Sequence, residues 1–384
     1  MQIKFNYRYY TDETEFETYA CQFNDIVDQR IATQLADVGE VVDFAESAQQ
    51  QGHYVALYLP YEAARYFNEE MTTCEVKDPY VYAAVYVLDE PGKEHPQEVS
   101  SHETNFPESM SPFEFQLSDE MLVKGIQKVQ DEIVRGNTYQ VNYTTRLKTT
   151  ADKPISVLYE TLQQQSNGFY TALIDTPEVQ VASISPELFF QQGSFKSMDN
   201  VIVSKPMKGT MPRGRTDEED EKNVETLAHS EKDRAENVMI VDLLRNDISR
   251  IAREGSVKVY QLFAVEHYAT VLQMTSMVTG QLRPTQSLVD ILRALFPCGS
   301  ITGAPKLNTM KYIAQLEQQP RHIYCGTIGL LLPNGKRIFN VPIRTIQYIN
   351  QQAIYGVGAG ITIDSDPMSE VREFKDKTSI LEAL

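Results

Sequence analysis

Apolar residues recur at helical spacing in the segment that begins at Ser118. The residues separated by four, three and four positions are Leu122, Ile126, Val129 and Ile133. This spacing places them on one face of a helix. Ser118 is a favourable N-cap, and Gly136 followed by Asn137 ends the pattern. The sequence therefore predicts an amphipathic helix over 118–136.

The next segment, 139–150, alternates between two faces as a strand does. One face carries Tyr139, Val141, Tyr143 and Leu147. The other face carries Gln140, Asn142, Thr144 and Arg146. A polar face in the middle of a chain is either solvent-exposed or lines a pocket, and the pattern alone favours solvent.

Helical and strand patterns alternate irregularly along the remaining chain. Helices are expected at 217–253, 305–317 and 367–382. Strands are expected at 256–263, 268–280, 323–332, 337–349 and 353–363, and strand character is also present at 51–67 and 78–90. Because strands follow one another rather than alternating strictly with helices, the pattern favours an α+β fold with large, mainly antiparallel sheets.

The chain of 384 residues reads as one domain, 1–384. The stretch 89–118 is rich in Pro, Ser, Glu and His, and we expect it to be a surface connection. It separates an N-terminal part, 1–117, from a part, 118–384, that carries every motif described below.

Charge and cysteine content narrow the class of protein. A net charge of −18 without a basic stripe argues against nucleic acid as a partner. No apolar run is long enough to span a bilayer, and no secretion signal is evident at the N-terminus. The four cysteines are scattered, as expected for reduced thiols in a cytoplasmic protein.

Two expected helices each carry a pair of carboxylates on one face. Asp233 and Glu236 are three positions apart, as are Glu370 and Glu373. A solvated ion pair between Glu373 and Lys377 is the simpler interpretation of the second helix taken alone. Together, the two pairs would suit a hard ion such as Mg²⁺, which prefers oxygen ligands.

Two glycine-containing segments offer further chemistry. The loop FPCGSITGAPK (296–306) leads into a helix, where free backbone N–H groups can bind an anion, although the nucleotide-binding ending GK[ST] is missing. Lys208 lies inside the turn SKPMKGTMPRG. Such a lysine is ordinarily a surface residue, and it becomes a nucleophile only where its pKa is lowered.

Read as a set, these motifs resemble the chorismate-binding enzyme family from about residue 118 to the end. The motifs that carry the resemblance are KPMKGTMPRG, DRAENVMIVDLLRND, FPCGSITGAPK, VPIRT and GAGITIDSDPMSEVREFKDK. The resemblance implies an anthranilate synthase component I-like fold, with two large sheets packed together and helices outside. It also implies an Mg²⁺-dependent enzyme acting on chorismate.

Roles for individual residues follow from the same resemblance. Glu236 and Glu373 match direct magnesium ligands, and Asp233 and Glu370 match positions that hold metal-bound waters. Glu187 matches the acid that assists departure of the C4 hydroxyl. The positions that match substrate-binding residues are Gln140, Thr210, Thr302, Gly303, Tyr324, Arg344, Gly358, Gly360 and Lys377.

Two positions discriminate between members of the family. Gln140 stands where members that use water carry a lysine base, so its presence favours ammonia as the nucleophile. Lys208 stands where anthranilate synthases usually carry alanine and aminodeoxychorismate synthases carry a lysine that forms a covalent intermediate. The resemblance is therefore greatest to the aminodeoxychorismate synthases, whose transaminase-type reaction yields the precursor of p-aminobenzoate and folate.

The resemblance also implies a partner protein, and two alternative functions stay open. No glutaminase pattern is present, so ammonia would come from a separate glutamine amidotransferase subunit. Gln273 stands where many relatives have histidine, which leaves the contribution of that histidine open. The alternatives are an anthranilate synthase large subunit and a catalytically inactive binding subunit.

Overall fold

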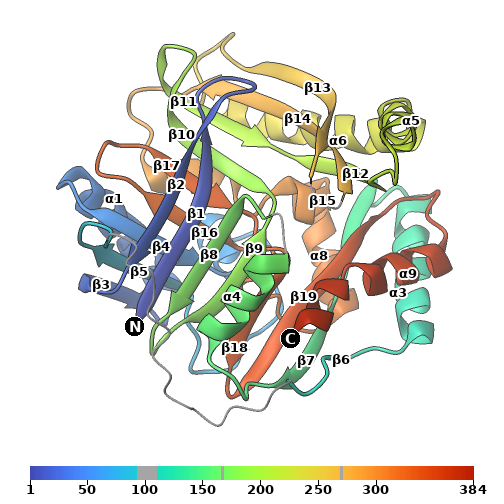
Figure 1. Ribbon diagram of the computed structural model, residues 1–384, viewed down its shortest axis with the longest axis horizontal. Helices are drawn as coiled ribbons and strands as arrows, with labels where there is room; N and C mark the ends of the chain where they lie inside the picture. Colours follow the sequence, from blue (N-terminus) through green and yellow to red (C-terminus); the bar gives the residue numbers. More distant parts are fainter. Residues whose placement is uncertain (93–109, 166–167, 269–270) are drawn as a thin grey trace.

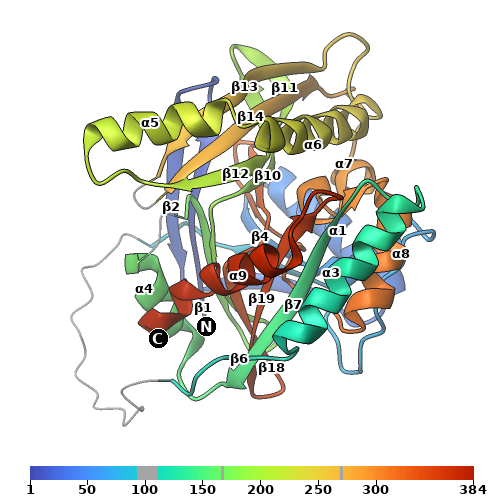
Figure 2. The ribbon, with the colours of Figure 1, turned by 90° about the vertical axis from the view of Figure 1, so that its right-hand side faces the viewer.

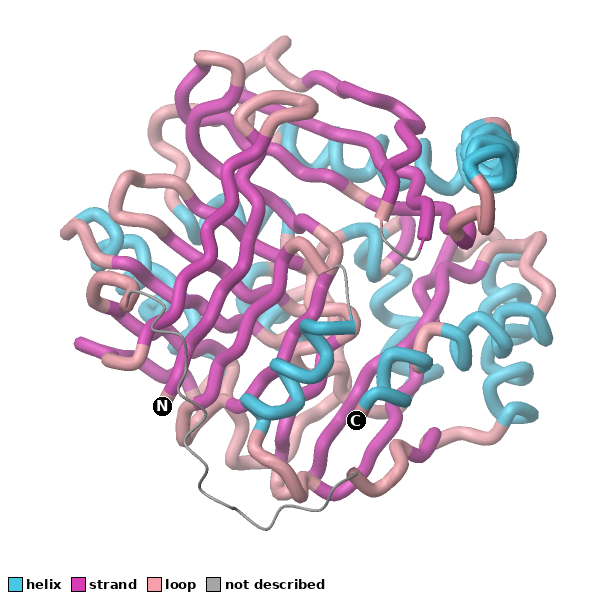
Figure 3. Tube along the Cα trace, in the orientation of Figure 1, coloured by secondary structure: helices cyan, strands magenta, loops and turns pink. Residues whose placement is uncertain are grey.

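Two large antiparallel sheets packed face to face form the centre of the molecule, and helices lie on the outside (Figures 1 and 3). The computed structural model describes residues 1–92, 110–165, 168–268 and 271–384. The expected surface connection 89–118 falls largely on residues 93–109, which lie outside the described residues.

We call the two sheets A and B. Sheet A contains β1 (Gln2–Tyr10), β2 (Phe16–Phe23), β6 (Glu114–Phe115), β7 (Gln140–Thr150), β8 (Tyr170–Asp175), β9 (Gln180–Ser185), β15 (Gly303–Ala304), β18 (Thr345–Ile349) and β19 (Gln352–Ile361). Sheet B contains β3 (Ile26–Ala32), β4 (Tyr54–Leu59), β5 (Ala83–Leu88), β10 (Leu188–Phe195), β11 (Met198–Lys205), β12 (Met207–Pro212), β13 (Lys258–His267), β14 (Val271–Gln281), β16 (Thr327–Leu331) and β17 (Arg337–Asn340).

The helices are α1 (Val38–Gln50), α2 (Ala64–Phe67), α3 (Asp119–Val134), α4 (Ile155–Gln165), α5 (Asp217–Ala228), α6 (Glu231–Ser249), α7 (Leu288–Leu295), α8 (Lys306–Glu317) and α9 (Pro367–Asp376). Short 3₁₀ turns occupy Leu35–Asp37, Tyr61–Ala63, Gly299–Ile301 and Ser379–Ala383. No helix within these described segments is long and apolar enough to cross a membrane.

Aromatic side chains fill the space between the sheets. Phe5 and Tyr7 of β1 pack in one cluster with Tyr58 of β4 and Tyr86 of β5. The Tyr7 hydroxyl crosses the interface and donates to the carbonyl oxygen of Ile328, at 2.9 Å. The outer face of sheet B packs on α1, α6 and α7, and that of sheet A packs on α3, α4 and α9. The predicted α+β fold with two large antiparallel sheets is confirmed.

The order of strands mixes the two ends of the chain. Sheet A runs β15-β7-β19-β18-β9-β8-β1-β2, with β6 beside β7. Sheet B runs β12-β14-β11-β10-β17-β16-β4-β5-β3, with β13 beside β14. N-terminal strands therefore pair directly with strands of the motif-bearing part, β1 with β8 and β4 with β16.

Local signals placed α3 and α8 correctly, but the extents of the other predicted helices were wrong. The helix predicted over 118–136 is α3, and its cap Ser118 accepts a hydrogen bond from the backbone N–H of Met121. The prediction of a single helix over 217–253 was wrong, because this segment forms two helices, α5 and α6. Ser230 is extended at the division and caps the first turn of α6. The helix expected over 367–382 ends at Asp376 and continues as a 3₁₀ turn.

Two strand predictions were also wrong in extent. The segment 337–349 is two strands, β17 in sheet B and β18 in sheet A, because the chain crosses between the sheets at the VPIR sequence. The strand character assigned to 51–67 ends at Leu59, where Pro60 precedes a helical turn.

The polar face of β7 is buried from Gln140 to Arg146, so the prediction that this face is exposed to solvent was wrong.

Candidate active site

A cavity of about 1300 Å³ lies where β7 and β19 of sheet A approach β12 and β14 of sheet B. Most of the predicted site residues line it together: Glu187, Lys208, Thr210, Asp233, Glu236, Tyr324, Arg344, Gly358, Gly360, Glu370, Glu373 and Lys377. Gln140, Thr302 and Gly303 are not among its lining residues. Residues scattered over the sequence are thus gathered around one space.

Lys208 reaches the cavity from a bulge in β12. The strand is paired with β14 at Met207 and again at Thr210, and the register shifts between them. A bulge of this kind redirects a side chain away from the regular alternation. Gly209 adopts a φ of +87°, and a Cβ there would lie 2.9 Å from the Asp233 side chain. Glycine is therefore needed for the lysine turn to pack against the first turn of α6.

The two carboxylate pairs face the cavity from two helices, one packed on each sheet. Asp233 and Glu236 lie on α6, and Glu370 and Glu373 lie on α9. In Figure 2, α9 lies across from α6 and β12. The i, i+3 spacing on each helix therefore directs both carboxylates of a pair to one side, as predicted.

Burial and neighbouring lysines shift these acids in different directions. Burial raises the pKa of Glu236, and the Lys208 ammonium reduces that effect. Burial also raises the pKa of Glu370, whose Oε2 is buried with no hydrogen-bond partner among the described residues. Burial acts likewise on Glu373, but lysines lower its pKa overall, foremost Lys377, whose Nζ lies 2.7 Å from Oε1.

The donor set fits a magnesium ion in its chemistry. In the segments that the structure describes, no three His, Cys, Asp or Glu side chains form a ready-made metal cluster. Mg²⁺ does not require one, because it binds through one or two carboxylates and keeps several waters. The buried Glu370 Oε2 has no hydrogen-bond partner among the described residues, so a bound cation or its water would supply one.

Glu187 is a buried carboxyl group that lines the cavity. It lies between β9 and β10, is 4% exposed, and accepts a hydrogen bond from the Ser300 hydroxyl at 2.7 Å. Burial raises the pKa of Glu187 to about 7, although Ser300 and Lys208 both act to lower it. A carboxyl group with this pKa is partly protonated near neutrality, where it can act as a general acid.

Arg344 and Tyr324 form one wall of the cavity. Arg344 lies in the crossing between β17 and β18 with a φ of +51°, and its carbonyl oxygen accepts from the N–H of Ile184 at 3.1 Å. Its guanidinium makes no hydrogen bond or ion pair with the described residues, which leaves it available to an anion. The Tyr324 ring lies so close to Gly356 that a Cβ on that glycine would collide with it.

The glycines of β19 also line the cavity. The Lys377 ammonium donates to the carbonyl oxygen of Gly358 at 2.8 Å. A Cβ on Gly360 would collide with the amide of Gln140 and lie 3.3 Å from the Lys208 ammonium nitrogen. Gln140, 1% exposed, therefore lies directly behind Gly360 and close to the lysine, and its Oε1 has no partner among the described residues.

Thr302 and Gly303 lie behind the cavity wall. The Thr302 hydroxyl donates to the carbonyl oxygen of Cys298 at 3.0 Å. Gly303, with a φ of +136°, pairs with Val141 of β7. Both residues hold the loop whose members Ser300 and Ile301 do line the cavity.

Several lining residues were not among the predicted site residues. Asn142 reaches the cavity from the polar face of β7, and Lys232 reaches it from α6. The position of Lys232, four residues before Glu236, was a signal that could have identified it. Gln273 donates to the Thr210 hydroxyl at 2.8 Å, so it fixes β12 and β14 together at the cavity.

The chain is similar in sequence to curated proteins. Aminodeoxychorismate synthase component 1 of Bacillus subtilis is 38% identical over 279 residues, which cover 72% of this chain and 58% of that protein. Anthranilate synthase component 1 1 of Haloarcula marismortui is 37% identical over 265 residues, which cover 69% of this chain and 53% of that protein. The chain thus spans little more than half the length of these curated relatives.

The fold is shared with solved structures. Anthranilate synthase component I from Streptococcus pneumoniae superposes with a TM-score of 0.74 at 23% identity, covering 99% of this chain and 90% of that chain. The family described as chorismate binding enzyme matches residues 5–383. Since that match extends over nearly the whole sequence, the chain belongs to the chorismate binding enzyme family.

Proposed function

We propose that this chain is an aminodeoxychorismate synthase component I, which converts chorismate and ammonia to 4-amino-4-deoxychorismate. The observation that carries the proposal is that Lys208 and Glu187 line the same cavity, with the lysine close enough to lower the pKa of the acid. The Bacillus subtilis relative bears the corresponding name. The product would serve as the precursor of p-aminobenzoate and folate.

The proposed reaction proceeds through a covalent adduct. Lys208 gives a proton to solvent water, which it regains after its amine leaves C2; the free amine attacks C2 of chorismate, while the C4 hydroxyl departs as water with a proton from Glu187. Ammonia then attacks C4, the lysine amine leaves C2, and the Glu187 carboxylate takes the proton that the new amine releases. The sum is chorismate and ammonia giving 4-amino-4-deoxychorismate and water.

The remaining cavity residues would bind the substrate's anionic groups. Glu236 and Glu373 would hold Mg²⁺, with Asp233 and Glu370 holding its waters. When bound, the ion would neutralise the ring carboxylate of chorismate within an otherwise acidic site. Arg344 and Tyr324 would bind the other carboxylate, since a guanidinium matches the planar shape of that group. The other predicted substrate-binding positions are Gln140, Thr210, Thr302, Gly303, Gly358, Gly360 and Lys377.

The source of ammonia is part of the proposal. A separate glutamine amidotransferase subunit would supply it, as the word component in the relative's name implies for that protein. With the chain alone, ammonium salt should support turnover and glutamine should not. Turnover with glutamine alone would contradict this division of labour.

The experiment is incubation with chorismate, Mg²⁺ and ammonium salt. We expect a product that yields p-aminobenzoate only after a separate lyase is added. Fluorescent anthranilate formed without the lyase would instead support the anthranilate synthase alternative, which the Haloarcula marismortui relative represents. Absence of any turnover would favour an inactive binding subunit.

The covalent step has its own test. Lys208→Ala should lose most of the aminated product, and mass spectrometry of the unsubstituted protein with chorismate, without ammonia, should show an adduct on Lys208. Lys311→Ala, on the exposed face of α8, is the matched control and should retain activity. Unchanged turnover in Lys208→Ala would refute the covalent role.

A further inference from the structure

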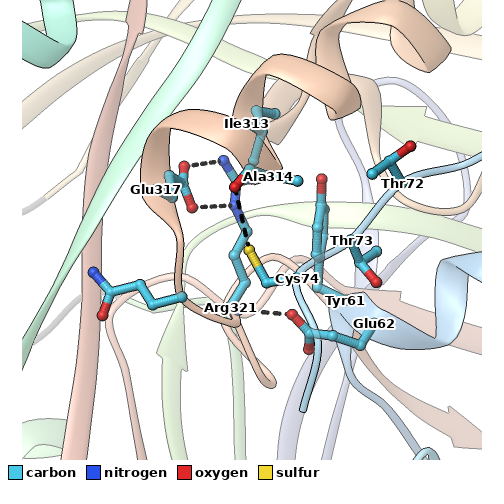
Figure 4. A pocket seen from close by; sticks show the side chains of 10 residues that line it. Tyr61, Glu62, Thr72, Thr73, Cys74, Ile313, Ala314, Glu317 and Arg321 are labelled. Carbon is cyan, nitrogen blue, oxygen red and sulfur yellow. Dashed lines mark hydrogen bonds and ion pairs between the residues drawn. The ribbon is translucent and has the colours of Figure 1, made fainter.

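A fully buried ion cluster lies directly behind the cavity wall. Arg146 of β7 and Arg321, which follows α8, both bind the carboxylate of Glu317, and their side chains are about 1% exposed. Figure 4 shows Glu317 facing Arg321, with Glu62 beside the backbone of that arginine. None of these residues lines the cavity.

The Glu317 carboxylate is saturated with donors. Its Oε1 accepts from Arg321 at 2.6 Å and from the backbone N–H of Thr144 at 3.0 Å. Its Oε2 accepts from Arg321 at 3.1 Å and from Arg146 at 3.2 Å. The bidentate contact with Arg321 fixes the plane of both groups. The cluster is therefore geometrically rigid.

The same guanidinium holds two segments that line the cavity. Arg321 donates to the carbonyl oxygens of Ile301 and Asn142, both at 2.7 Å, and both of those residues line the cavity. The Glu62 carboxylate accepts from the backbone N–H groups of Arg321 and His322, at 2.7 and 3.0 Å. This contact sets the start of the turn that leads to the cavity residue Tyr324.

Two guanidinium groups contact one carboxylate in this cluster. Arg146 and Arg321 share the single carboxylate of Glu317, and burial raises the pKa of Glu62, which weakens the next available countercharge. The Arg146 guanidinium carbon lies 5.5 Å from the centroid of the Tyr324 ring. At that distance a cation is attracted to the face of the aromatic ring.

We propose that Arg146, Glu317 and Arg321 are positioning residues that fix the Tyr324 wall of the cavity and make it attractive to a carboxylate of the ligand. The inference rests on the proposed function, because chorismate supplies that carboxylate. A buried ion cluster is weak evidence for stability, since apolar replacements are often neutral or stabilising. The bonds to Ile301 and Asn142 give this cluster a different use, which is to align two separate cavity segments with the turn before Tyr324 that begins at Arg321.

The test is Arg146→Met, which removes the guanidinium that lies over the Tyr324 ring. In the proposed function, this wall binds a carboxylate that does not react. Loss of that contact should therefore weaken binding of the ground state and of the transition state equally. We expect KM for chorismate to rise about tenfold while kcat changes less than about threefold. Arg146→Lys keeps the charge and should restore KM to within about threefold of the unsubstituted protein.

A matched control distinguishes positioning from stability alone. Arg337 and Glu46 form another ion pair, 2.6 Å apart and only partly exposed, and neither residue lines the cavity. Arg337→Met should lower Tm and leave KM unchanged. If Arg146→Met also lowers Tm without changing KM, the inference is wrong. Should Arg146→Met not fold, Arg146→Gln, which can still hydrogen-bond to Glu317, carries the same expectation.

Calorimetric binding of chorismate in the presence of Mg²⁺ separates this inference from the proposed function. Binding by the unsubstituted protein without formation of an aminated product would overturn the proposed function alone. Equal affinity of the unsubstituted protein and Arg146→Met would overturn the positioning role alone. Absence of binding to the unsubstituted protein would overturn both.

Discussion

The Lys306 ammonium lies 2.7 Å from a carboxylate oxygen of Asp247 and 2.9 Å from the carbonyl oxygen of Leu295. Asp247 lies near the end of α6, and Lys306 begins α8 immediately after the cavity loop. Two motif residues that do not line the cavity thus join the helix bearing one carboxylate pair to the loop bearing Ser300.

Lys306→Met should therefore destabilise the fold. Side-chain exposure is 9% for the lysine and 1% for the aspartate, so the change leaves a buried carboxylate whose remaining partner is Arg250. We expect the free energy of unfolding to fall by about 3 kcal/mol, measured by urea denaturation. Arg293→Met, in an exposed pair, should change it by less than about 0.5 kcal/mol. Equal losses in the two variants would contradict this account.

Glu187 should impose an alkaline limit on activity. With a pKa of about 7, it loses its proton as the pH rises through neutrality, so kcat/KM for chorismate should fall above about pH 7. Glu187→Gln should lose about 10²–10⁴-fold in rate and show no such limb. A limb that persists in this variant would assign it to another group.

Ser300→Ala offers a second test of the same acid. The Ser300 hydroxyl donates to the Glu187 carboxylate and so stabilises its charged form. Its removal should raise the pKa of Glu187 further and move the alkaline limb to higher pH. The pH–rate profiles of the two proteins measure this shift, and a shift to lower pH would show that the sign is wrong.

Glu370→Gln should stabilise the metal-free protein and reduce its stabilisation by Mg²⁺. In the absence of metal, this substitution removes a buried charge with an unpartnered oxygen, so the free energy of unfolding should rise by about 1 kcal/mol. The increase in Tm caused by added Mg²⁺ should become smaller. Thermal unfolding with EDTA and with magnesium chloride measures both effects. Glu120→Gln, exposed on α3, should behave like the unsubstituted protein in both conditions.

Gly356→Ala should displace Tyr324 from the cavity wall. The added methyl group would collide with the tyrosine ring, which is buried and cannot move freely. We expect KM for chorismate to rise by about tenfold or more, measured by steady-state kinetics. At Gly92 a Cβ would have no neighbour nearer than 3.9 Å, so Gly92→Ala is the control and should leave KM unchanged.

Features governed by neighbours in the sequence could be predicted from the sequence. The four-three-four spacing in α3 and the cap at Ser118 depend on contacts within a few residues. The carboxylate pairs on α6 and α9 also follow from helical geometry, which directs positions i and i+3 to one side. That the two pairs face one cavity came from the family resemblance and not from either helix alone.

Features governed by residues far apart in the sequence could not be predicted from the sequence. Arg146 looked solvent-exposed because its partner Glu317 is 171 residues away, on a helix that no local pattern connects to β7. The crossing of the chain between sheets at Arg344 could not be predicted either. The sequence of β17 and β18 has the pattern of one continuous strand, although the two strands belong to different sheets. In both cases tertiary pairing overrode the local pattern.

The N-terminal third has a consequence for any attempt to shorten this protein. A fragment that begins at Ser118 would retain every motif but lose β1 and β4, which pair with β8 and β16. Those two strands would then present unpaired N–H and C=O groups, next to an aromatic face that is now in water. Bare edges of this kind recruit strands from other chains. Such fragments are expected to form insoluble assemblies rather than a minimal enzyme.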